Sequence, residues 1–460
     1  MPWFLCIFYF FFLKQFLNND FDIVLITIDT LRADHLSCYG YKRKTSPNID
    51  KIANEGIRFT RTTATSPWTP PSMASIMTSL YPMSHGVNNG VFRDGEAYNQ
   101  EYLSDTFTTL AEVLKENGYT TFGAAANAHM SEDLGFAQGF DYYYCKWFDN
   151  ASELNKVVFS WKNKMQNSEK VFLWLHYIDP HDPYSAKLPW IDYYSSKPWR
   201  GKQNLPETRI KELRGLIPLF KKRSRARKYI TALYDSEISF VDYHMGFLLD
   251  NLGLKNDPLI IIASDHGEEF LDHGSLGHGH TLYQELVHVP FIIKLPDPYN
   301  EYAGKTINMP TSIIDIMPTI LGFLNIPLPD GLMGESLFDK YRQIRIPERK
   351  YLFSDRIVFK TILKKHWKYI YHYCTKEEQL YNIKKDRRET HNLILDETPI
   401  AKELKKELLS RVSAAPKAPS AQKKVYLSRE REKQLMAMGY IQNTEEEYKR
   451  KYSCSVEVCH

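Results

Sequence analysis

The 460-residue chain has few of the features that mark specialised classes of protein. Its six cysteines form no CxxC pair and show no Cys/His spacing typical of structural zinc. The net charge is only +4, which is too small to indicate a nucleic-acid partner. Apolar residues make up 43% of the chain and charged residues 25%, a balance that excludes disordered and fibrous proteins. The length is sufficient for one large domain and a smaller one.

Long hydrophobic runs are also scarce, and the clearest one lies at the N-terminus, from Pro2 to Leu13. It is too short to span a bilayer, which needs about 20 residues, but it matches the core of a signal peptide. An export signal within residues 1–20 is favoured, and it predicts an extracytoplasmic protein: periplasmic, secreted or membrane-anchored. Because no basic residue precedes the run and no A-x-A site follows it, a short anchor or an expression remnant is the alternative.

Short apolar segments rich in β-branched residues predict buried strands at residues 21–28, 171–175, 258–264 and 289–294. The first leads directly into Asp29, the second into His176, and the third into Asp265 and His266. In a parallel sheet, ligands bind outside the C-terminal ends of the strands. We therefore expect these side chains to meet at one edge of the sheet.

Helical spacing of apolar residues occurs between the strands, at residues 110–114 and 230–248. The alternation predicts an α/β fold for residues 21–345, with a mainly parallel sheet covered by helices on both faces. Short aromatic segments then predict a small C-terminal α+β subdomain at 346–413, with a helix at about 399–412. Residues 414–460 are predicted to be a linker and tail, and residues 185–228, rich in Trp, Tyr, Lys and Arg, a lid.

One segment, from Ser66 to Pro82, carries a second kind of signal. We expect Pro70 and Pro71 to delay a helix until Ser72, which would place Thr69 at the mouth of its N-terminus. Backbone N–H groups and the helix dipole favour an anion there. Taken alone, the segment is better explained as an ordinary Ser/Thr cap.

The order of five segments changes that interpretation. Residues 28–36, 68–81, 176–184, 264–269 and 277–283 together resemble the sulfatase family of the alkaline phosphatase superfamily. The resemblance spans residues 22–392 and extends to a C-terminal signature at 434–441. It implies that Asp29, Asp265 and His266 bind a metal, and that Thr69 is the nucleophile whose oxygen also contacts this metal. The implied cofactor is one divalent ion, Ca²⁺ by family, with Mn²⁺, Mg²⁺ or Zn²⁺ as alternatives.

The resemblance also implies catalytic roles for three histidines. His129 matches a histidine beside the nucleophile, His181 matches one that contacts the anionic head group, and His278 stands where lysine is common. Such groups can protonate a departing alkoxide and stabilise the developing charge. We interpret the remaining conspicuous histidines as structural, although His280 could exchange roles with His278: they are His35, His85, His176, His280 and His288.

The sequence departs from the family at the site itself. Sulfatases carry a cysteine or serine that is oxidised to formylglycine, and Thr69 cannot undergo this modification. Met73 stands in place of a familiar arginine, Thr30 in place of a second aspartate, and Asn127 in place of a lysine. Because threonine has one hydroxyl, its covalent adduct must be cleaved by water at sulfur or phosphorus, which favours phosphoester chemistry.

We therefore expect a metal-dependent hydrolase of sulfate or phosphate esters. Its substrate is predicted to be a sulfated or phosphorylated glycan, lipid or small molecule, with no nucleic-acid partner and with membrane association only through the N-terminus. The alternatives are a transferase of the phosphoethanolamine type and a non-catalytic binding protein. The last is disfavoured because a dead site has no need for buried charges that each cost several kcal/mol without a metal.

Overall fold

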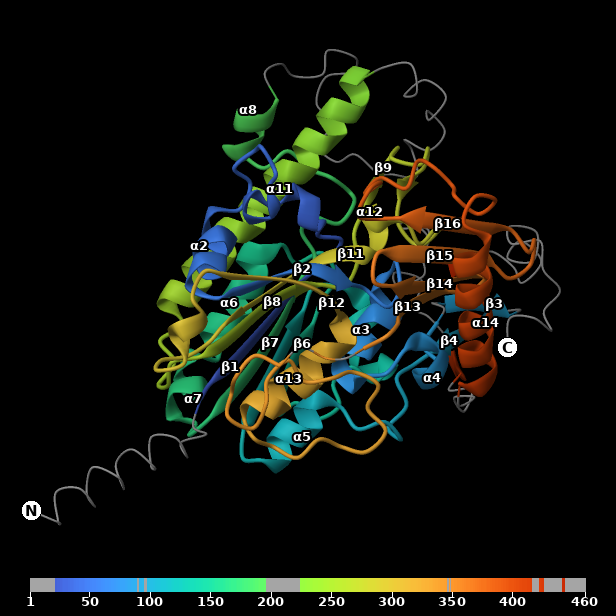
Figure 1. The fold of residues 1–460 in the computed structure, drawn as a ribbon. Helices are drawn as coiled ribbons and strands as arrows, with labels where there is room; N and C mark the ends of the chain where they lie inside the picture. The colour runs from blue at the N-terminus through green and yellow to red at the C-terminus, as the bar shows by residue number, and fades with distance from the viewer. Residues whose placement is uncertain are drawn as a thin grey trace, which may run out of the picture.

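The computed structural model describes residues 21–88, 91–94, 97–195, 224–345, 347, 349–415, 422–425 and 441–442. The predicted N-terminal segment, most of the predicted lid, and most of the predicted linker and tail lie outside these residues. The described part contains an eight-stranded sheet between two layers of helices, with a four-stranded sheet beside it (Figure 1). None of the described helices combines the length and the hydropathy that a bilayer span requires.

The central sheet has the strand order β12-β2-β11-β8-β1-β7-β5-β6. Its strands are β1 (Ile23–Ile28), β2 (Ile57–Thr63), β5 (Thr120–Ala125), β6 (Tyr142–Cys145), β7 (Val171–Tyr177), β8 (Leu259–Ser264), β11 (His288–Lys294) and β12 (Lys305–Ser312). All neighbours pair in parallel except β11, which is antiparallel to both β8 and β2. The chain stays at one edge of the sheet between β8 and β11, so β11 returns in the opposite direction. The predicted mainly parallel α/β fold is confirmed.

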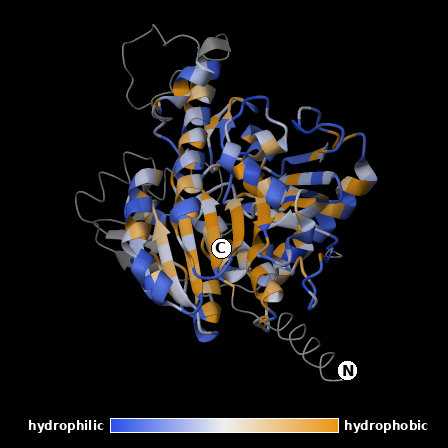
Figure 2. Cartoon of the chain, turned by 90° about the vertical axis from the view of Figure 1, so that its left-hand side faces the viewer, coloured by the Kyte–Doolittle hydropathy of each residue, from blue (hydrophilic) through white to orange (hydrophobic). Residues whose placement is uncertain are grey.

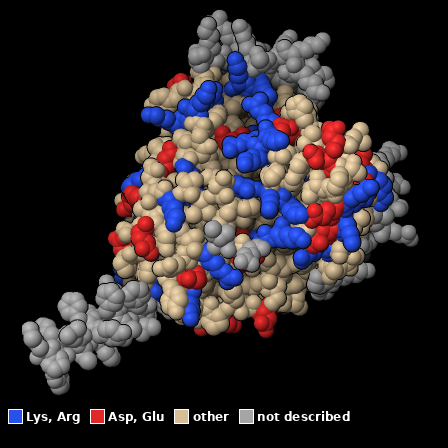
Figure 3. All heavy atoms as spheres, in the orientation of Figure 1, with Lys and Arg blue, Asp and Glu red and all other residues tan. Residues whose placement is uncertain are grey.

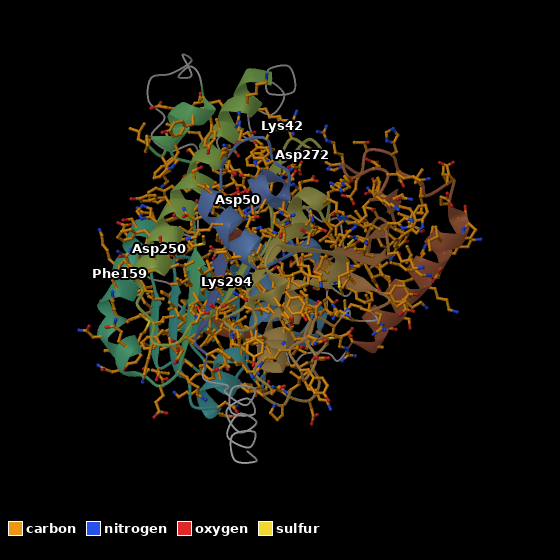
Figure 4. The ribbon with its side chains drawn as sticks, turned by 60° about the vertical axis from the view of Figure 1, so that its left-hand side comes forward. Lys42, Asp50, Phe159, Asp250, Asp272 and Lys294 are labelled. Atoms are coloured by element: carbon orange, nitrogen blue, oxygen red, sulfur yellow. The ribbon has the colours of Figure 1, made fainter. Side chains whose placement is uncertain are left out.

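The two faces of the sheet are buried by different helices. Along β1, Ile23 and Leu25 pack into one apolar cluster, whereas Val24 and Ile26 pack into the other. The first cluster includes residues of α3 (Thr69–Thr78), α5 (Leu110–Glu116) and α13 (Ile316–Phe323). The second includes residues of α2 (Pro47–Glu55), α6 (Ala151–Ser160) and α11 (Ser224–Asn251). Figure 2 shows these central strands as mostly apolar, and Figure 4, where Asp50 and Asp250 are labelled, shows α2 beside α11.

The C-terminal subdomain is an antiparallel sheet with one helix, as expected. Its strands are β13 (Leu352–Arg356), β14 (Phe359–Lys364), β15 (Trp367–His372) and β16 (Glu378–Asn382). Helix α14 (Thr398–Ala414) buries Ala401, Leu404 and Leu408 against this sheet. Strand β13 is joined to the α/β domain, because Ser354 Oγ donates to the Ala64 carbonyl at 2.5 Å.

Shorter elements complete the described chain. Strands β3 (Val91–Asp94), β4 (Ala97–Glu101), β17 (Gln422–Val425) and β18 (Ile441–Gln442) form a second four-stranded sheet. Strands β9 (Glu269–Phe270) and β10 (Leu276–Gly277) form a hairpin in the connection between β8 and β11. The short α-helices are α4 (Pro82–His85), α7 (Lys162–Asn167), α8 (Trp190–Tyr194) and α12 (Gln284–Val287).

Candidate active site

Four neighbouring strands deliver polar side chains to one edge of the central sheet. Asp29 follows β1, and Asp265 and His266 follow β8. On the other side of β1, β7 carries His176 near its end, and β5 leads to Asn127. All five side chains are buried, and the parallel pairing of β8, β1, β7 and β5 brings their C-terminal ends together.

Helix α3 supplies Thr69 to this edge and begins earlier than the sequence predicted. The prediction that the prolines delay the helix until Ser72 is wrong, because the helix starts at Thr69 and its first turn contains both Pro70 and Pro71. The N–H groups of a first turn have no intrahelical partner, so proline is tolerated there. Trp68 is the N-cap residue, in an extended conformation. Thr69 therefore lies in the first turn itself, where it is almost fully buried.

The Thr69 hydroxyl lies among the predicted metal ligands. Its Oγ1 is 3.2 Å from His266 Nε2 and 3.5 Å from Asp29 Oδ2. His266 Nε2 in turn lies 3.5 Å from Asp29 Oδ1 and 3.4 Å from Asp265 Oδ2. The ligand atoms of Asp29, Asp265 and His266 are all within 4.8 Å of one another. One small cation can contact this whole set.

The electrostatics of the cluster fit a cation. Three buried oxygens, Asp29 Oδ1, Thr30 Oγ1 and Asp265 Oδ2, have no hydrogen-bond partner among the described residues. Burial, together with the Asp29 charge, raises the pKa of Asp265 above its ordinary value. Burial also lowers the pKa of His266 to about 4, which keeps its ring in the neutral form that binds metals. Two carboxylates, an imidazole and a hydroxyl make a donor set suited to one divalent ion, which would offset the repulsion between the carboxylates.

Two of the predicted catalytic histidines stand beside this cluster. The ring of His278 lies 4.6 Å from that of His266 and 4.9 Å from that of His181. Glu268 Oε1 lies 3.1 Å from His278 Nδ1, and a hydrogen bond that it accepts from this nitrogen fixes the orientation of the ring. Burial opposes protonation of His181, but the charges of Asp29 and Asp182 raise its pKa above the ordinary value. His181 is thus suited to a proton-donating role.

Comparison with known proteins places this geometry in a family. The family model described as Sulfatase matches residues 22–326. The chain belongs to the sulfatase family. An arylsulfatase of Clostridium perfringens is 26% identical over 447 residues, covering 82% of this chain and 90% of that protein. An ulvan-active sulfatase of Formosa agariphila is 28% identical over 354 residues, covering 69% and 64%.

A solved structure supports the fold independently. The phosphonate monoester hydrolase of Agrobacterium radiobacter superimposes with a TM-score of 0.67 at 21% identity, covering 86% of this chain and 95% of that one. Membership of the sulfatase family makes the protein an enzyme of the sulfuric ester hydrolase type, in a family that is generally metal-dependent.

Two residues of this sulfatase-family site were missed or undervalued in the sequence. His176, which we interpreted as structural, has its Nε2 3.4 Å from Asp29 Oδ2 and its Nδ1 2.9 Å from Thr27 Oγ1. Asn127, counted as a loss, donates from Nδ2 to Asp29 Oδ2 at 2.7 Å and lies 3.5 Å from Thr69 Oγ1. His176 follows a predicted strand, which indicated its location but not its partner, and Asn127 follows β5, which was not predicted from the sequence. Both help to fix the Asp29 carboxylate.

Of the other histidines named in the sequence analysis, some lie near the site and some bond only to the surrounding fold. His129 is buried against Trp68, the residue before Thr69, with ring centroids 5.2 Å apart. His280 has both ring nitrogens engaged, Nε2 with Glu269 at 2.7 Å and Nδ1 with the His278 carbonyl at 3.1 Å, so it does not take over from His278. The other three bond away from the cluster: His35 to Asp235, His85 to Ser75, and His288 to the Thr60 carbonyl.

Met73, which stands in place of the family's arginine, is part of the apolar core. It lies fully buried in the apolar cluster on one face of the sheet. An arginine there would need a partner for its charge. Replacement by methionine turns this position of α3 into part of the core.

Proposed function

We propose that the protein is a metal-dependent ester hydrolase in which Thr69 is the nucleophile, and that its preferred head group is phosphoryl or phosphonyl. The observation that carries the proposal is the position of Thr69 Oγ1, 3.2 Å from His266 Nε2 and 3.5 Å from the Asp29 carboxylate, in the first turn of a buried helix. An anionic head group placed there also lies at the positive end of the helix dipole of α3.

The reaction has two displacements. The Thr69 hydroxyl releases its proton to solvent and its Oγ attacks phosphorus; a P–Oγ bond forms, the bond to the leaving alkoxide breaks, and the alkoxide takes a proton from His278 or His181. Water then attacks phosphorus, the P–Oγ bond breaks, the released head group keeps one proton of the water as a P–OH group, and Thr69 Oγ takes up a proton from solvent. The histidine that gave up its proton takes one from the attacking water, so no proton is lost over the cycle.

Asp29, Asp265, His266 and Thr69 would hold one divalent ion, Ca²⁺ by family, with Mn²⁺, Mg²⁺ and Zn²⁺ as alternatives. When bound, such an ion supplies a positive charge that neutralises the head group and lowers the pKa of the attacking hydroxyl. The chain's own residues do the rest: Asn127 and His176 hold the Asp29 carboxylate, and Glu268 orients His278.

The choice between phosphate and sulfate depends on the second step. A formylglycine hydrate can expel sulfate through its second hydroxyl, whereas Thr69 has only one and depends on attack by water. The name of one solved neighbour, a phosphonate monoester hydrolase, supports phosphorus chemistry on this fold. The names of the curated relatives, an arylsulfatase and an ulvan-active sulfatase, support a sulfated aryl or glycan substrate instead.

The surface supports an anionic substrate in either case. On the face shown in Figure 3, Lys and Arg side chains gather over α12 and over strands β13 and β14. Basic side chains that gather on one face of a protein raise the concentration of anions near that face. An extracytoplasmic location stays a prediction, because residues 1–20 lie outside the described part of the chain.

The test is a parallel assay of aryl phosphate, aryl phosphonate, phosphodiester and aryl sulfate substrates with each of the four metals. We expect turnover of a phosphorus ester, and a loss of at least about a thousandfold in kcat for Thr69→Ala with metal content retained. Thr69→Ser, which keeps the hydroxyl, is the matched control and should stay within about tenfold of wild type.

The other outcomes are equally informative. Wild-type rates in Thr69→Ala would remove Thr69 from its role. Faster turnover of sulfate than of any phosphorus ester would replace the head group that we propose. Transfer to an added alcohol in preference to water would identify a transferase, and the absence of turnover with every substrate and metal would identify a binding protein.

A further inference from the structure

The last residue of β13, Arg356, reaches from the C-terminal subdomain into the active-site edge. Its side chain is almost fully buried. Nε donates to the Gly279 carbonyl at 3.0 Å, and Nη1 donates to the Asn88 carbonyl at 2.9 Å. Its guanidinium carbon also lies 5.0 Å from the centroid of the Trp68 ring. A single cation therefore contacts three segments that are far apart in the sequence.

Two of these segments carry proposed catalytic residues. Trp68 directly precedes Thr69 and packs against His129. Gly279 directly follows His278, and its N–H donates to the Pro67 carbonyl at 2.9 Å. The nucleophile segment and the His278 segment are thus bonded to each other through Gly279, and Arg356 bonds to the same residue from the other side.

The space around Gly279 confirms how closely these groups pack. Gly279 has a φ of +76°, and a Cβ built there would lie 3.7 Å from Trp68 Cβ and 4.0 Å from Arg356 Nε. Both distances are ordinary van der Waals contacts, so the glycine is favoured by its left-handed backbone conformation and not by a lack of space.

The backbone on which Arg356 stands is held in place by hydrogen bonds of its neighbours. The neighbouring Asp355 N–H donates to the Thr65 carbonyl at 2.8 Å, and Ser354 Oγ donates to the Ala64 carbonyl. Strand β13 is therefore held against the segment that leads to Thr69. Because this strand is fixed, the Arg356 guanidinium is held at a fixed position relative to the site.

We propose that Arg356 is a positioning residue that sets the distance between Thr69 and His278. This inference rests on the function proposed above for those two residues. Arginine suits the task because its planar guanidinium donates from two nitrogens in fixed directions while it lies against an aromatic ring. Lysine carries the same charge but offers a single ammonium, which cannot bridge both carbonyls with that geometry.

The experiment compares Arg356→Lys with Arg342→Lys. Arg342 is a matched control because it is equally buried, donates from Nε to the Phe323 carbonyl at 2.8 Å, and lies over the rings of Phe21 and Tyr299. For each variant we would measure kcat, KM, bound metal and thermal midpoint. The substrates are substituted phenyl phosphates whose leaving groups differ in pKa, with substituted phenyl sulfates in parallel.

We expect Arg356→Lys to bind metal like wild type and to lose about 10- to 100-fold in kcat, with little change in KM. The loss should be larger for poor leaving groups, because these depend most on a well-placed proton donor. Added methylguanidinium should restore part of the kcat of Arg356→Ala. Arg342→Lys should lower the thermal midpoint while the kcat of its folded fraction stays within about twofold.

Two results would overturn the inference: a kcat for Arg356→Lys equal to wild type with every leaving group, or a uniform loss that follows the folded fraction as in Arg342→Lys. The Thr69→Ala result separates this failure from that of the proposed function. If Thr69→Ala is inactive and Arg356→Lys is unimpaired, only the positioning role is refuted. If Thr69→Ala is fully active, the proposed function is refuted.

Discussion

Thr30, beside the proposed metal ligands, has a strained backbone conformation that costs conformational free energy. It follows Asp29 directly and has a φ of 56°, in the left-handed region that β-branched residues rarely adopt. Its N–H donates to Asp265 Oδ1 at 3.3 Å, and its carbonyl accepts from the Tyr234 hydroxyl at 2.7 Å. These bonds keep the backbone in place at a cost of roughly 1–2 kcal/mol.

Replacing Thr30 with aspartate should therefore increase the affinity of the site for its metal. Thr30→Asp relieves the backbone strain and adds a third carboxylate, so we expect metal affinity to rise by about tenfold, or about 1.4 kcal/mol. Thr30→Asn is the control because asparagine also tolerates the left-handed conformation but adds no charge. Calorimetric titration of the metal-free proteins measures the difference. Equal affinities in the two variants would show that the extra charge does not reach the metal.

The site residues differed in how well the sequence could predict them. Asp29, Asp265 and His266 were accessible because each follows an apolar strand directly, and Thr69 because a helix begins beside it. The role of His176 was not accessible, because it depends on the register that pairs His176 with Thr27 across two strands. Asn127 was judged by what it replaces, and only the structure shows its bond to Asp29.

At the scale of elements, the loop between β9 and α12 is joined to the C-terminal sheet by buried charges. Lys368 of β15 pairs with Glu389 at 2.8 Å, and both side chains are almost fully buried. His273, in the loop, lies 2.5 Å from Glu285 through Nδ1 and 3.2 Å from the Glu389 carbonyl through Nε2. Its ring stacks on Tyr283 with centroids 3.6 Å apart. This cluster supports the same loop that carries His278.

The cluster predicts a pH dependence of stability. Burial opposes protonation of His273, but the hydrogen bond and charge of Glu285 raise its pKa to about 9 from 6.5. The contribution of protonated His273 to the free energy of unfolding is therefore complete below about pH 6.5. It is lost as the pH rises through about 9. At roughly 1.4 kcal/mol for each unit of pKa, the protonated His273 contributes at most about 3.5 kcal/mol, and less where solvent screens the pair.

Denaturation curves of His273→Gln and wild type between pH 6 and 10 measure this contribution. The difference in stability should be largest at pH 6 and should vanish above about pH 9. His391→Gln is the control, since His391 is exposed and 3.6 Å from Asp386, and such pairs contribute less than about 1 kcal/mol. A difference that stays constant with pH would show that His273 acts by packing alone.

Elements with strong apolar patterns were predictable, and those decided by packing were not. The strands β1, β7 and β8 and the helix α11 match their predicted positions, because continuous or helically spaced apolar residues mark them. The direction of β11 was not predictable from its composition, since a buried strand looks the same in either direction. The start of α3 was misjudged because proline can both break a helix and begin one.

At the scale of the whole molecule, the bound metal should raise the stability of the fold in addition to its role in catalysis. A ligand at 100 times its Kd adds about 2.7 kcal/mol, so chelation should lower the thermal midpoint by roughly 3–6 °C. Asp265→Asn should bind little metal, and its midpoint should not respond to the chelator.

We expect one ion per chain. Two ions would assign a second site to His181, Asp182 and His278, whose ligand atoms also lie within 4.8 Å of one another.

The catalytic domain and the C-terminal subdomain form one structural unit. Tyr81 and Ile314, which precede the predicted boundary at residue 345, share an apolar cluster with Tyr351 and Leu404, which follow it. The sequence located the subdomain from its aromatic content. It contained no signal that Arg356 of this subdomain contacts Trp68 and Gly279, which are next to Thr69 and His278 in the chain.

The bond between Ser354 and Ala64 joins residues that are 290 positions apart in the chain. As the ribosome adds residues one after another, the segment that contains Thr69 emerges long before the strand that supports it. The segment that contains Thr69 therefore lacks its contacts with β13 until synthesis reaches the last quarter of the chain. A chain that ends before residue 350 would carry every proposed ligand and the proposed nucleophile, but it would lack the strand that supports them, and we expect it to turn over substrate more slowly.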